Sequence, residues 1–174
     1  MTTQENNLIE VCQRIIDSPS HTRTDLEEFI KEKLCRLNPT EAQKIMTKYD
    51  WAAIFTTNFD DLIEYTYRSM ITMSKNVTVI TTDVPMLSPN NTEKIYVFKI
   101  MGDINAYQSE EPCKTDGQMV LSRLDYNRSL RRRTTYFKHL SDYIRHGRIV
   151  FIGYSFNDRI VLDVIDELKG DFGL

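Results

Sequence analysis

The stretch AAIFTTNFDDLIE, residues 52–64, marks the point where the chain changes from helical patterning to a strand followed by a helix. Its first half is a short apolar run that ends in threonines, which is typical of a strand buried in a sheet. Leu62, Ile63 and Met70 then share one face of a predicted helix over residues 59–71. A strand that leads directly into a helix is the first unit of an α/β sheet.

Three more apolar runs predict further strands, at residues 77–80, 95–100 and 148–153. The last of them, RIVFIG, has the strongest strand pattern in the chain. Residues 83–93 carry prolines and asparagines and are predicted to be a loop, while residues 105–117 are polar and are predicted to be an exposed excursion.

Helices are expected between and after these strands. Residues 124–145 are predicted to be helical, starting near Ser122 and Asp125, whose spacing is typical of a helix start. The apolar face of a closing helix is formed by Ile160, Val161, Val164, Ile165 and Leu168. Alternating strands and helices predict an α/β fold, with a Rossmann-like, mostly parallel sheet of about four strands and helices on both faces.

The first part of the chain, residues 1–50, is predicted to be helical. Two pairs of residues have the capping-box spacing that marks a helix start, namely Thr24 with Glu27 and Thr40 with Gln43. Residues 51–174 are expected to form the Rossmann-like core. We predict that both parts belong to a single domain that spans residues 1–174.

The composition is that of an ordinary globular protein, with 41% hydrophobic and 27% charged residues. A formal net charge of -3 is too small to predict a nucleic-acid or membrane surface by itself. The N-terminus lacks the pattern of a signal peptide, and no segment reaches the roughly 18 apolar residues of a membrane helix. The cysteines form no C-x-x-C pair, so no structural zinc is expected. We predict a cytoplasmic protein.

One basic run in the second half of the chain allows two interpretations. It comprises Arg128, Arg131, Arg132 and Arg133, with Tyr126, Tyr136 and Lys138 nearby. Basic and aromatic residues together can bind nucleic acid or phosphate. Such a run is more often a solvated helix face whose charges pair with acids, and the overall charge is not basic. Nucleic-acid binding therefore stays a minor alternative.

In an open parallel sheet, ligands bind beyond the carboxyl ends of the strands, and three short segments occupy such positions here. They are residues 56–61, 101–103 and 153–158, and each combines small residues with Asn, Asp or Ser. A structural role is also open, because Asn58 or Asp60 could cap the next helix and the glycines could only permit tight turns. Three such segments at one edge of a sheet favour a ligand site.

These segments contain motifs that resemble those of the sirtuin (silent information regulator) superfamily. The motifs are TTNFDDLIE at residues 56–64, KIMGDI at residues 99–104 and FIGYSFND at residues 151–158. The resemblance is to the bacterial branch without a zinc ribbon, whose members are often NAD-hydrolysing proteins of antiviral defence. That branch shows a strand ending in TTN-aromatic-D, a later K-[IL]-H-G and a final G-[YT]-S. The resemblance covers residues 51–168 and implies a Rossmann-like fold that handles NAD.

The resemblance also implies roles for individual residues. Asn58 would face the nicotinamide ribose and position the attacking water or nucleophile, and Asp60 would support that ribose or the nicotinamide pocket. These two are the candidate catalytic residues. The candidate NAD-binding residues are Thr57, Asn58, Asp60, Gly102, Asp103, Gly153 and Ser155. Gly153 and Ser155 would approach the ribose and phosphates, with Asp158 bracing their loop, and no metal ion is implied.

Two departures from the family pattern bear on activity. Met101 stands where the family has a histidine that acts as a general base on a ribose hydroxyl, and a thioether cannot accept that proton. All six glycines lie at Gly102 or later, so the usual first strand and the glycine loop that cradles the pyrophosphate are expected to be lacking. Such a sheet would expose an edge that a partner chain could cover.

Two functions follow from these observations. The first is an NAD glycohydrolase-type enzyme that cleaves the nicotinamide–ribose bond and is impaired by Met101. The alternative is a non-catalytic module that binds NAD or an ADP-ribose-like nucleotide weakly, or binds only a protein partner. We expect a homo-oligomer or a subunit of a larger assembly, with no membrane association.

Overall fold

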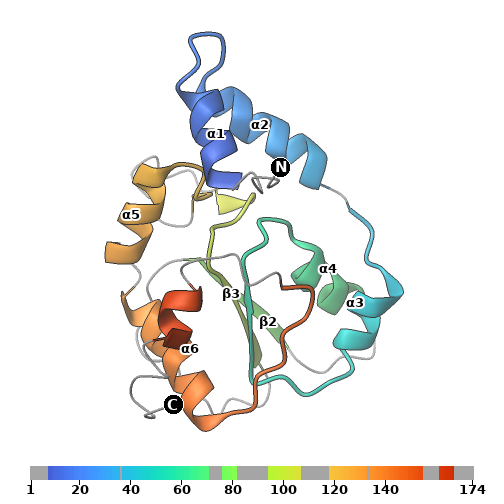
Figure 1. The fold of residues 1–174 in the computed structure, drawn as a ribbon. Coiled ribbons are helices and arrows are strands. Elements are labelled where there is room, and N and C mark those ends of the chain that lie inside the picture. Colours follow the sequence, from blue (N-terminus) through green and yellow to red (C-terminus); the bar gives the residue numbers. More distant parts are fainter. Residues whose placement is uncertain are drawn as a thin grey trace, which may run out of the picture.

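The computed structural model describes residues 8–35, 37–70, 76–81, 94–106, 118–132, 134–154 and 161–166. A parallel sheet lies at the centre of these residues, helices cover both of its faces, and two further helices extend beyond one end of it (Figure 1). The fold is α/β, as the sequence predicts.

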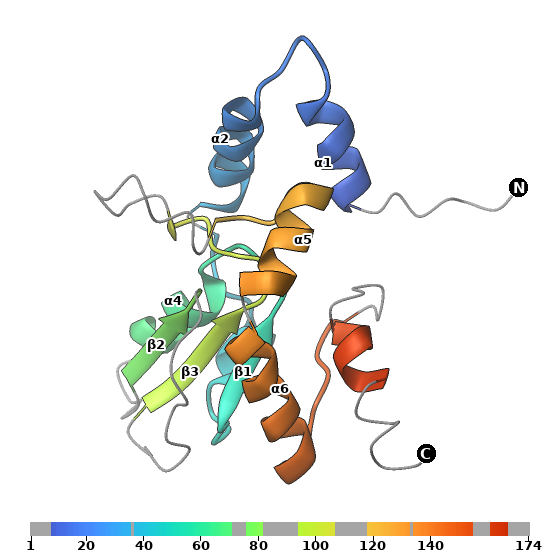
Figure 2. The same ribbon diagram turned by 90° about the vertical axis from the view of Figure 1, so that its left-hand side faces the viewer.

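The sheet contains β1 (Ala53–Thr56), β2 (Asn76–Ile80) and β3 (Lys94–Lys99), all parallel, in the order β1-β3-β2. In the central strand, Phe98 is paired with Phe55 of β1. Figure 2 shows β2 and β3 side by side and pointing the same way, so their carboxyl ends meet at one edge of the sheet. These three strands confirm three of the four predicted strands, with small shifts at their ends.

Alternate residues of β3 face opposite sides of the sheet, and each side is covered by a different helix. Phe98 faces α6 (Thr134–His146), and the neighbouring Lys99 faces α4 (Leu62–Ser69). Figure 2 shows α6 in front of the sheet and α4 behind it. Helices therefore cover both faces, as predicted for a Rossmann-like sheet.

The core on the α6 side is built around Phe98, which is fully buried. Its ring stacks on that of Phe55 at 4.5 Å and meets the ring of Tyr136 edge-on at 5.1 Å. The Tyr136 hydroxyl donates to the carbonyl oxygen of Ile80 at 3.1 Å, which satisfies the buried phenol. These contacts join α6 to all three strands.

The first part of the chain is helical in its described residues, as predicted. It contains α1 (Leu8–Ile16), α2 (Arg23–Leu34) and α3 (Glu41–Met46). The predicted capping box at the start of α3 is confirmed, because the Thr40 side chain accepts from the Gln43 amide and the Gln43 side chain accepts from the Thr40 amide.

The other predicted capping box, Thr24 with Glu27, is wrong. The structure uses Thr22 and Asp25 instead, with the Thr22 amide donating to the Asp25 carboxylate at 2.7 Å. The N-cap residue, Thr22, lies two residues before Thr24, and α2 begins at Arg23, so Thr24 lies inside the helix. Glu27 forms an ion pair with Arg23 at 2.6 Å rather than capping the helix.

Arg23 joins the first helices to α5 (Arg123–Arg132). Its guanidinium lies 2.5 Å from the Asp125 carboxylate and donates to the Met119 carbonyl oxygen at 3.0 Å. Burial alone would lower the pKa of Arg23, but the hydrogen bonds and charges of Asp125 and of a carboxylate on α2 outweigh burial and raise it. Asp125 also accepts from the Ser122 amide, and Ser122 caps α5 in return, as its spacing predicts. That residues 1–174 form a single domain stays a prediction.

The predicted strand at residues 148–153 is wrong, so the described residues form three strands rather than about four. Ile149, Val150, Phe151 and Ile152 are exposed by 43%, 59%, 45% and 61%. The segment leaves the end of α6 and runs outside the sheet (Figures 1 and 2). An apolar run gives strand propensity, but a strand also needs a neighbouring edge to pair with, and the described sheet does not include this segment.

Candidate functional site

The candidate site lies where β1 and β3 end. Beyond the strands, backbone hydrogen bonds still join the segment that follows β1 to the segment that follows β3. The Ile100 amide donates to the Thr56 carbonyl oxygen at 2.8 Å. Further on, the Ile104 amide donates to the Phe59 carbonyl oxygen at 3.1 Å. The loop over residues 57–61 and the turn over residues 100–104 are therefore held side by side, as expected for two segments at one sheet edge.

The loop over residues 57–61 exposes one of the two candidate catalytic side chains. Asn58 is exposed, and its amide donates to the Thr56 hydroxyl at 3.1 Å, while the next residue, Phe59, is buried. Thr57 is half-buried. The buried Phe59 anchors the loop, and the side-chain amide of the exposed Asn58 is left accessible to a ligand.

Asp60, the second candidate catalytic residue, has a structural role in this geometry. Its carboxylate accepts from the Leu62 amide at 3.1 Å, at the first residue of α4. Asp61, the residue next to the helix, makes no capping hydrogen bond through its side chain. The capping interpretation thus holds for Asp60, because one free amide of the first helical turn is satisfied there.

Met101, which stands in the histidine position of the resemblance, is buried. Its side chain is 7% exposed and belongs to the main hydrophobic cluster. Its carbonyl oxygen accepts from the Val120 amide at 2.8 Å. The side chain at the position where the resemblance expects a histidine is therefore packed in the core of this chain.

Gly102 is required by a close approach of two backbone segments. It has a φ of 96°, and a Cβ at this position would lie 2.2 Å from the Gln118 carbonyl oxygen. No side chain fits there, and the conformation itself is one that glycine adopts readily. The proposed NAD-binding role of Gly102 is not needed to explain the glycine.

Asp103 points into the protein. It is 6% exposed, its carboxylate accepts from the Asn105 amide at 2.9 Å, and it lies 3.2 Å from the Lys99 ammonium nitrogen. These contacts use the carboxylate to hold the turn rather than to present it to a ligand.

Lys99 is the residue at this edge that the sequence interpretation missed. It is fully buried, and its ammonium group lies 2.6 Å from the Glu64 carboxylate and 2.6 Å from the Asp60 carbonyl oxygen. The signal was present, since a lysine at an inward-facing position of the apolar run IYVFKI has to find charged or polar partners.

Glu64 is the main partner of this lysine and is also buried, at 2% exposure. Burial raises the pKa of its carboxyl group above the ordinary value, the Lys99 charge and hydrogen bond lower it, and the Asp103 charge raises it further. Its second carboxylate oxygen, Oε2, is buried without a hydrogen-bond partner among the described residues.

The third predicted segment, residues 153–158, is only partly covered by the structure. Gly153 is exposed, has a φ of 62° and meets no atom within 4 Å of an added Cβ. The turn interpretation therefore suffices for Gly153, and no described contact brings it to the first two segments. Ser155 and Asp158 lie outside the described residues, so their roles stay predictions.

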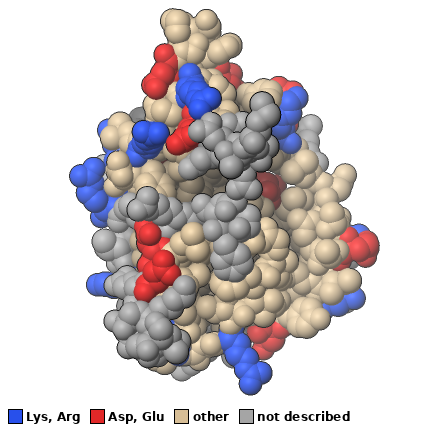
Figure 3. Space-filling model, viewed as in Figure 1, with Lys and Arg blue, Asp and Glu red and all other residues tan. Residues whose placement is uncertain are grey.

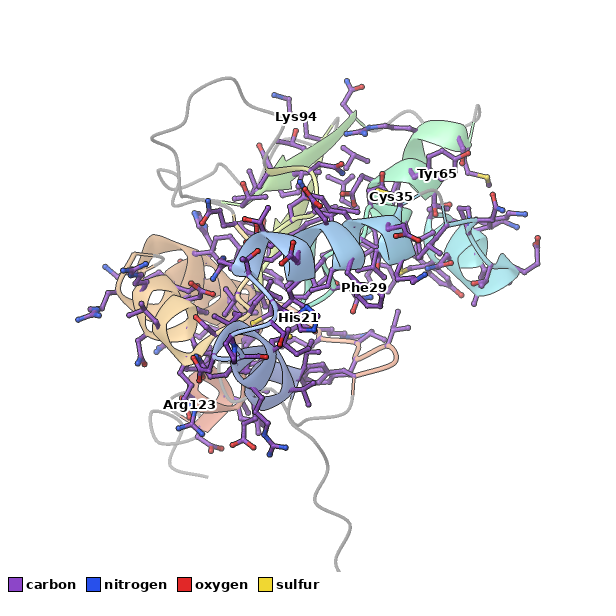
Figure 4. All side chains as sticks on the ribbon, turned by 90° about the horizontal axis from the view of Figure 1, so that it is seen from above. His21, Phe29, Cys35, Tyr65, Lys94 and Arg123 are labelled. Carbon is purple, nitrogen blue, oxygen red and sulfur yellow. The ribbon has the colours of Figure 1, made fainter. Side chains whose placement is uncertain are left out.

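A pocket of about 310 Å³ lies between α1 and α2, away from the strand ends. It is lined by Ile15, His21, Asp25, Leu26 and Phe29. Phe29 lies on α2, and His21 lies in the connection between α1 and α2 (Figure 4). The lining is mostly apolar, which does not suit the phosphates of a nucleotide, so this pocket is a poorer candidate for the site than the sheet edge.

Charges on the face shown in Figure 3 are mixed, with Lys and Arg interspersed among Asp and Glu. Within the described part of the chain, no three His, Cys, Asp or Glu side chains are arranged to hold a metal ion. Among the same residues, no helix combines the length and apolar character needed to cross a bilayer.

Comparison with known proteins connects this geometry to a family. The NAD(+) hydrolase ThsA of Bacillus cereus (strain MSX-D12) is 26% identical to this chain over 156 residues, which cover 89% of the chain and 30% of ThsA. The chain thus spans less than a third of that relative. The profile of the SIR2-like domain matches residues 52–174, which include β1, the loop after it and the turn after β3. By this match the chain belongs to the SIR2-like domain family.

Proposed function

We propose that the chain binds NAD, or an ADP-ribose-like nucleotide, at the sheet edge formed by residues 57–61 and 100–104, and that Met101 impairs its cleavage of the nicotinamide–ribose bond. The relation to an NAD(+) hydrolase supports the choice of ligand. The family match supports the placement, because it includes both segments. The role in antiviral defence that the resemblance implies stays a prediction.

The observation that carries the proposal is the contrast between Asn58 and Met101. Asn58 is exposed on a loop anchored by the buried Phe59, so its amide can donate to and accept from a ribose or a nucleophilic water. Met101 is buried and has only a weakly accepting sulfur, so it supplies no general base. The site thus retains a polar group for binding and lacks the group for proton abstraction.

The first test measures NAD binding by calorimetry and nicotinamide release by chromatography on the purified chain. We expect binding that falls by roughly tenfold in Asn58→Ala, with little or no nicotinamide release in either protein. Lys94→Met, at the exposed start of β3, is the matched control and should bind like the unchanged chain. Binding that is absent, or equal in Asn58→Ala, would contradict the assignment of this edge.

The second test restores the missing base with Met101→His. An imidazole titrates near neutral pH and can accept a proton from a ribose hydroxyl, so we expect nicotinamide release above the unchanged chain. Met101→Leu is the packing control, because it keeps a similar volume and adds no base. Equal release from both variants would show that the histidine position does not account for the impairment.

The alternative function is a non-catalytic module that binds another protein chain. The exposed apolar segment over residues 149–152 favours it, because four consecutive exposed apolar residues are unusual on a soluble surface. A second copy of the chain is the simplest partner. Val150→Lys should then shift the mass measured by light scattering from oligomer to monomer, and a monomeric unchanged chain would exclude self-association through this segment.

A further inference from the structure

Three buried charged groups meet beneath the candidate site, and each comes from a different part of the fold. Lys99 belongs to β3, Glu64 to α4 and Asp103 to the turn after β3. Their exposed fractions are 0%, 2% and 6%. We call these three residues the buried charge cluster. Two carboxylates and one ammonium leave it with an excess of one negative charge when all three groups are ionised.

The contacts of Lys99 extend from this cluster to the backbone of the neighbouring loop. Its ammonium group donates to the carbonyl oxygen of Asp60 at 2.6 Å, and the carbonyl oxygen of Phe59 lies 3.4 Å away. The same Phe59 oxygen accepts from the Ile104 amide at 3.1 Å. The ammonium group is therefore bound between the loop that follows β1 and the turn that follows β3.

We propose that Lys99 is the positioning residue of this site: it fixes the backbone of residues 58–60 against the turn over residues 100–104, and Glu64 holds its ammonium group in place. The inference rests on the proposed function, because the loop that Lys99 fixes carries Asn58. Lys99 itself is fully buried and acts through the loop rather than on a ligand.

Stability alone does not account for a cluster of this kind. Burying charges costs free energy, and replacing a buried ion pair by apolar side chains of similar volume is often neutral or stabilising. Two backbone carbonyl groups of one loop, by contrast, cannot hydrogen-bond to an apolar side chain. The ammonium group of Lys99 thus holds the loop backbone in one conformation, which an apolar side chain could not do.

Within the buried charge cluster, Glu64 is the residue that orients the Lys99 ammonium group. Its Oε1 accepts from Lys99 at 2.6 Å, whereas its Oε2 is buried without a partner among the described residues. The negative charge of the carboxylate strengthens this hydrogen bond, because a charge-assisted hydrogen bond is stronger than a neutral one. A glutamine at this position keeps that oxygen and removes the charge, so it separates orientation from charge.

Amide hydrogen exchange of the complete chain tests the proposal without relying on enzymatic activity. In the double variant Lys99→Met with Glu64→Gln, we expect the Leu62 and Ile104 amides to lose roughly tenfold or more of their protection. The amides of α6 serve as the internal reference, since α6 covers the other face of the sheet. A general loss of stability would lower protection at all of these amides together.

Two more variants complete the test. Glu64→Gln alone is expected to fold and to give a smaller loss of protection at the same two amides, which keeps the test decisive if the double variant does not fold. Lys94→Met is the matched control and should leave both amides unchanged. Protection at Leu62 and Ile104 within about twofold of the unchanged chain in every folded variant would overturn the positioning role.

Calorimetry with NAD then links the loop to the ligand. If the loop carries the binding site, NAD should bind at least roughly tenfold more weakly to the variants that lose protection at Leu62 and Ile104. Unchanged NAD affinity in such variants would overturn the link between Lys99 and the site. If the unchanged chain does not bind NAD, the proposed function fails, while the exchange result still decides whether Lys99 fixes the loop.

Discussion

Two apolar runs of this chain have nearly the same sequence pattern, but one forms a buried strand and the other is exposed. KIYVFK forms β3, and all of its residues after Lys94 are buried. RIVFIG, residues 148–153, forms no strand, and all of its residues are exposed. β3 pairs with a neighbour on each side, and helices cover both of its faces. The difference shows that burial comes from the neighbours that a run acquires and not from its apolar content alone.

The largest expected effect comes from the charged end of β3. Lys99→Met leaves the Glu64 and Asp103 carboxylates buried without their cation, so we expect the free energy of unfolding to fall by about 3–5 kcal/mol. Lys94→Met removes a lysine from the exposed start of the same strand (Figure 4), and its effect should stay within about 0.5 kcal/mol. Urea unfolding of both variants measures the difference, and similar losses would contradict the importance of the buried cluster.

A smaller but clear difference is expected between one aromatic residue of each run. Phe98→Ala should lower the free energy of unfolding by about 3–4 kcal/mol, because Phe98 is fully buried between Phe55 and Tyr136. Phe151→Ala, at 45% exposure, should cost less than about 1 kcal/mol. A loss at Phe151 as large as that at Phe98 would mean that another chain buries the second run in solution.

A third comparison is between Gly102, which follows β3, and Gly153, which ends the second run. Gly102→Ala combines an unfavourable φ with a clash against the Gln118 backbone, so we expect a loss of more than about 2 kcal/mol. Gly153→Ala meets no atom within 4 Å and should cost only about 1 kcal/mol for its φ. Thermal unfolding distinguishes these values, and equal losses would show that the region around Gly153 is also closely packed.

The smallest expected effect is a change in how steeply the free energy of unfolding depends on pH. Burial raises the folded-state pKa of Glu64 above 4.5, so the folded state binds more protons than the unfolded state. This contribution to stability is present below about pH 4.5 and is lost as the pH rises through the folded-state pKa. Glu64→Gln should therefore flatten the decline in stability from about pH 4.5 upward. Urea unfolding at several pH values measures this slope, and Glu32→Gln, at an exposed position of α2, should leave it unchanged. If Glu64→Gln keeps the slope of the unchanged chain, the pH dependence comes from another group.

Local patterns of the sequence predicted most of the fold. The strands at β1, β2 and β3 and the helices α4 to α6 follow from short-range periodicity, and the parallel arrangement follows from their alternation. The capping box of α2 was assigned two residues too late, because both Thr22 and Thr24 have an acidic residue three positions ahead. Residues 148–153 were misassigned because strand pairing is not a local property.

The meeting of two of the three predicted segments could be expected from the sequence, but the roles of their residues could not. The polar residues after β1 and β3 do meet at one edge, as the carboxyl ends of parallel strands must. The roles of Lys99 and Gly102 depend on residues that are distant in sequence, namely Glu64 and Gln118. No motif or spacing could show that Gly102 lies against another backbone segment or that Lys99 binds a loop.

The contacts of Arg23 have a consequence for how the chain unfolds. The Asp125 carboxylate that binds Arg23 also accepts from the backbone amides at the start of α5, so one group holds both helices. Detaching α2 would expose the cap of α5, and fraying α5 would leave the Arg23 charge without its main partner. The two helices are therefore coupled across about 100 residues of sequence and should melt in one cooperative step rather than in succession.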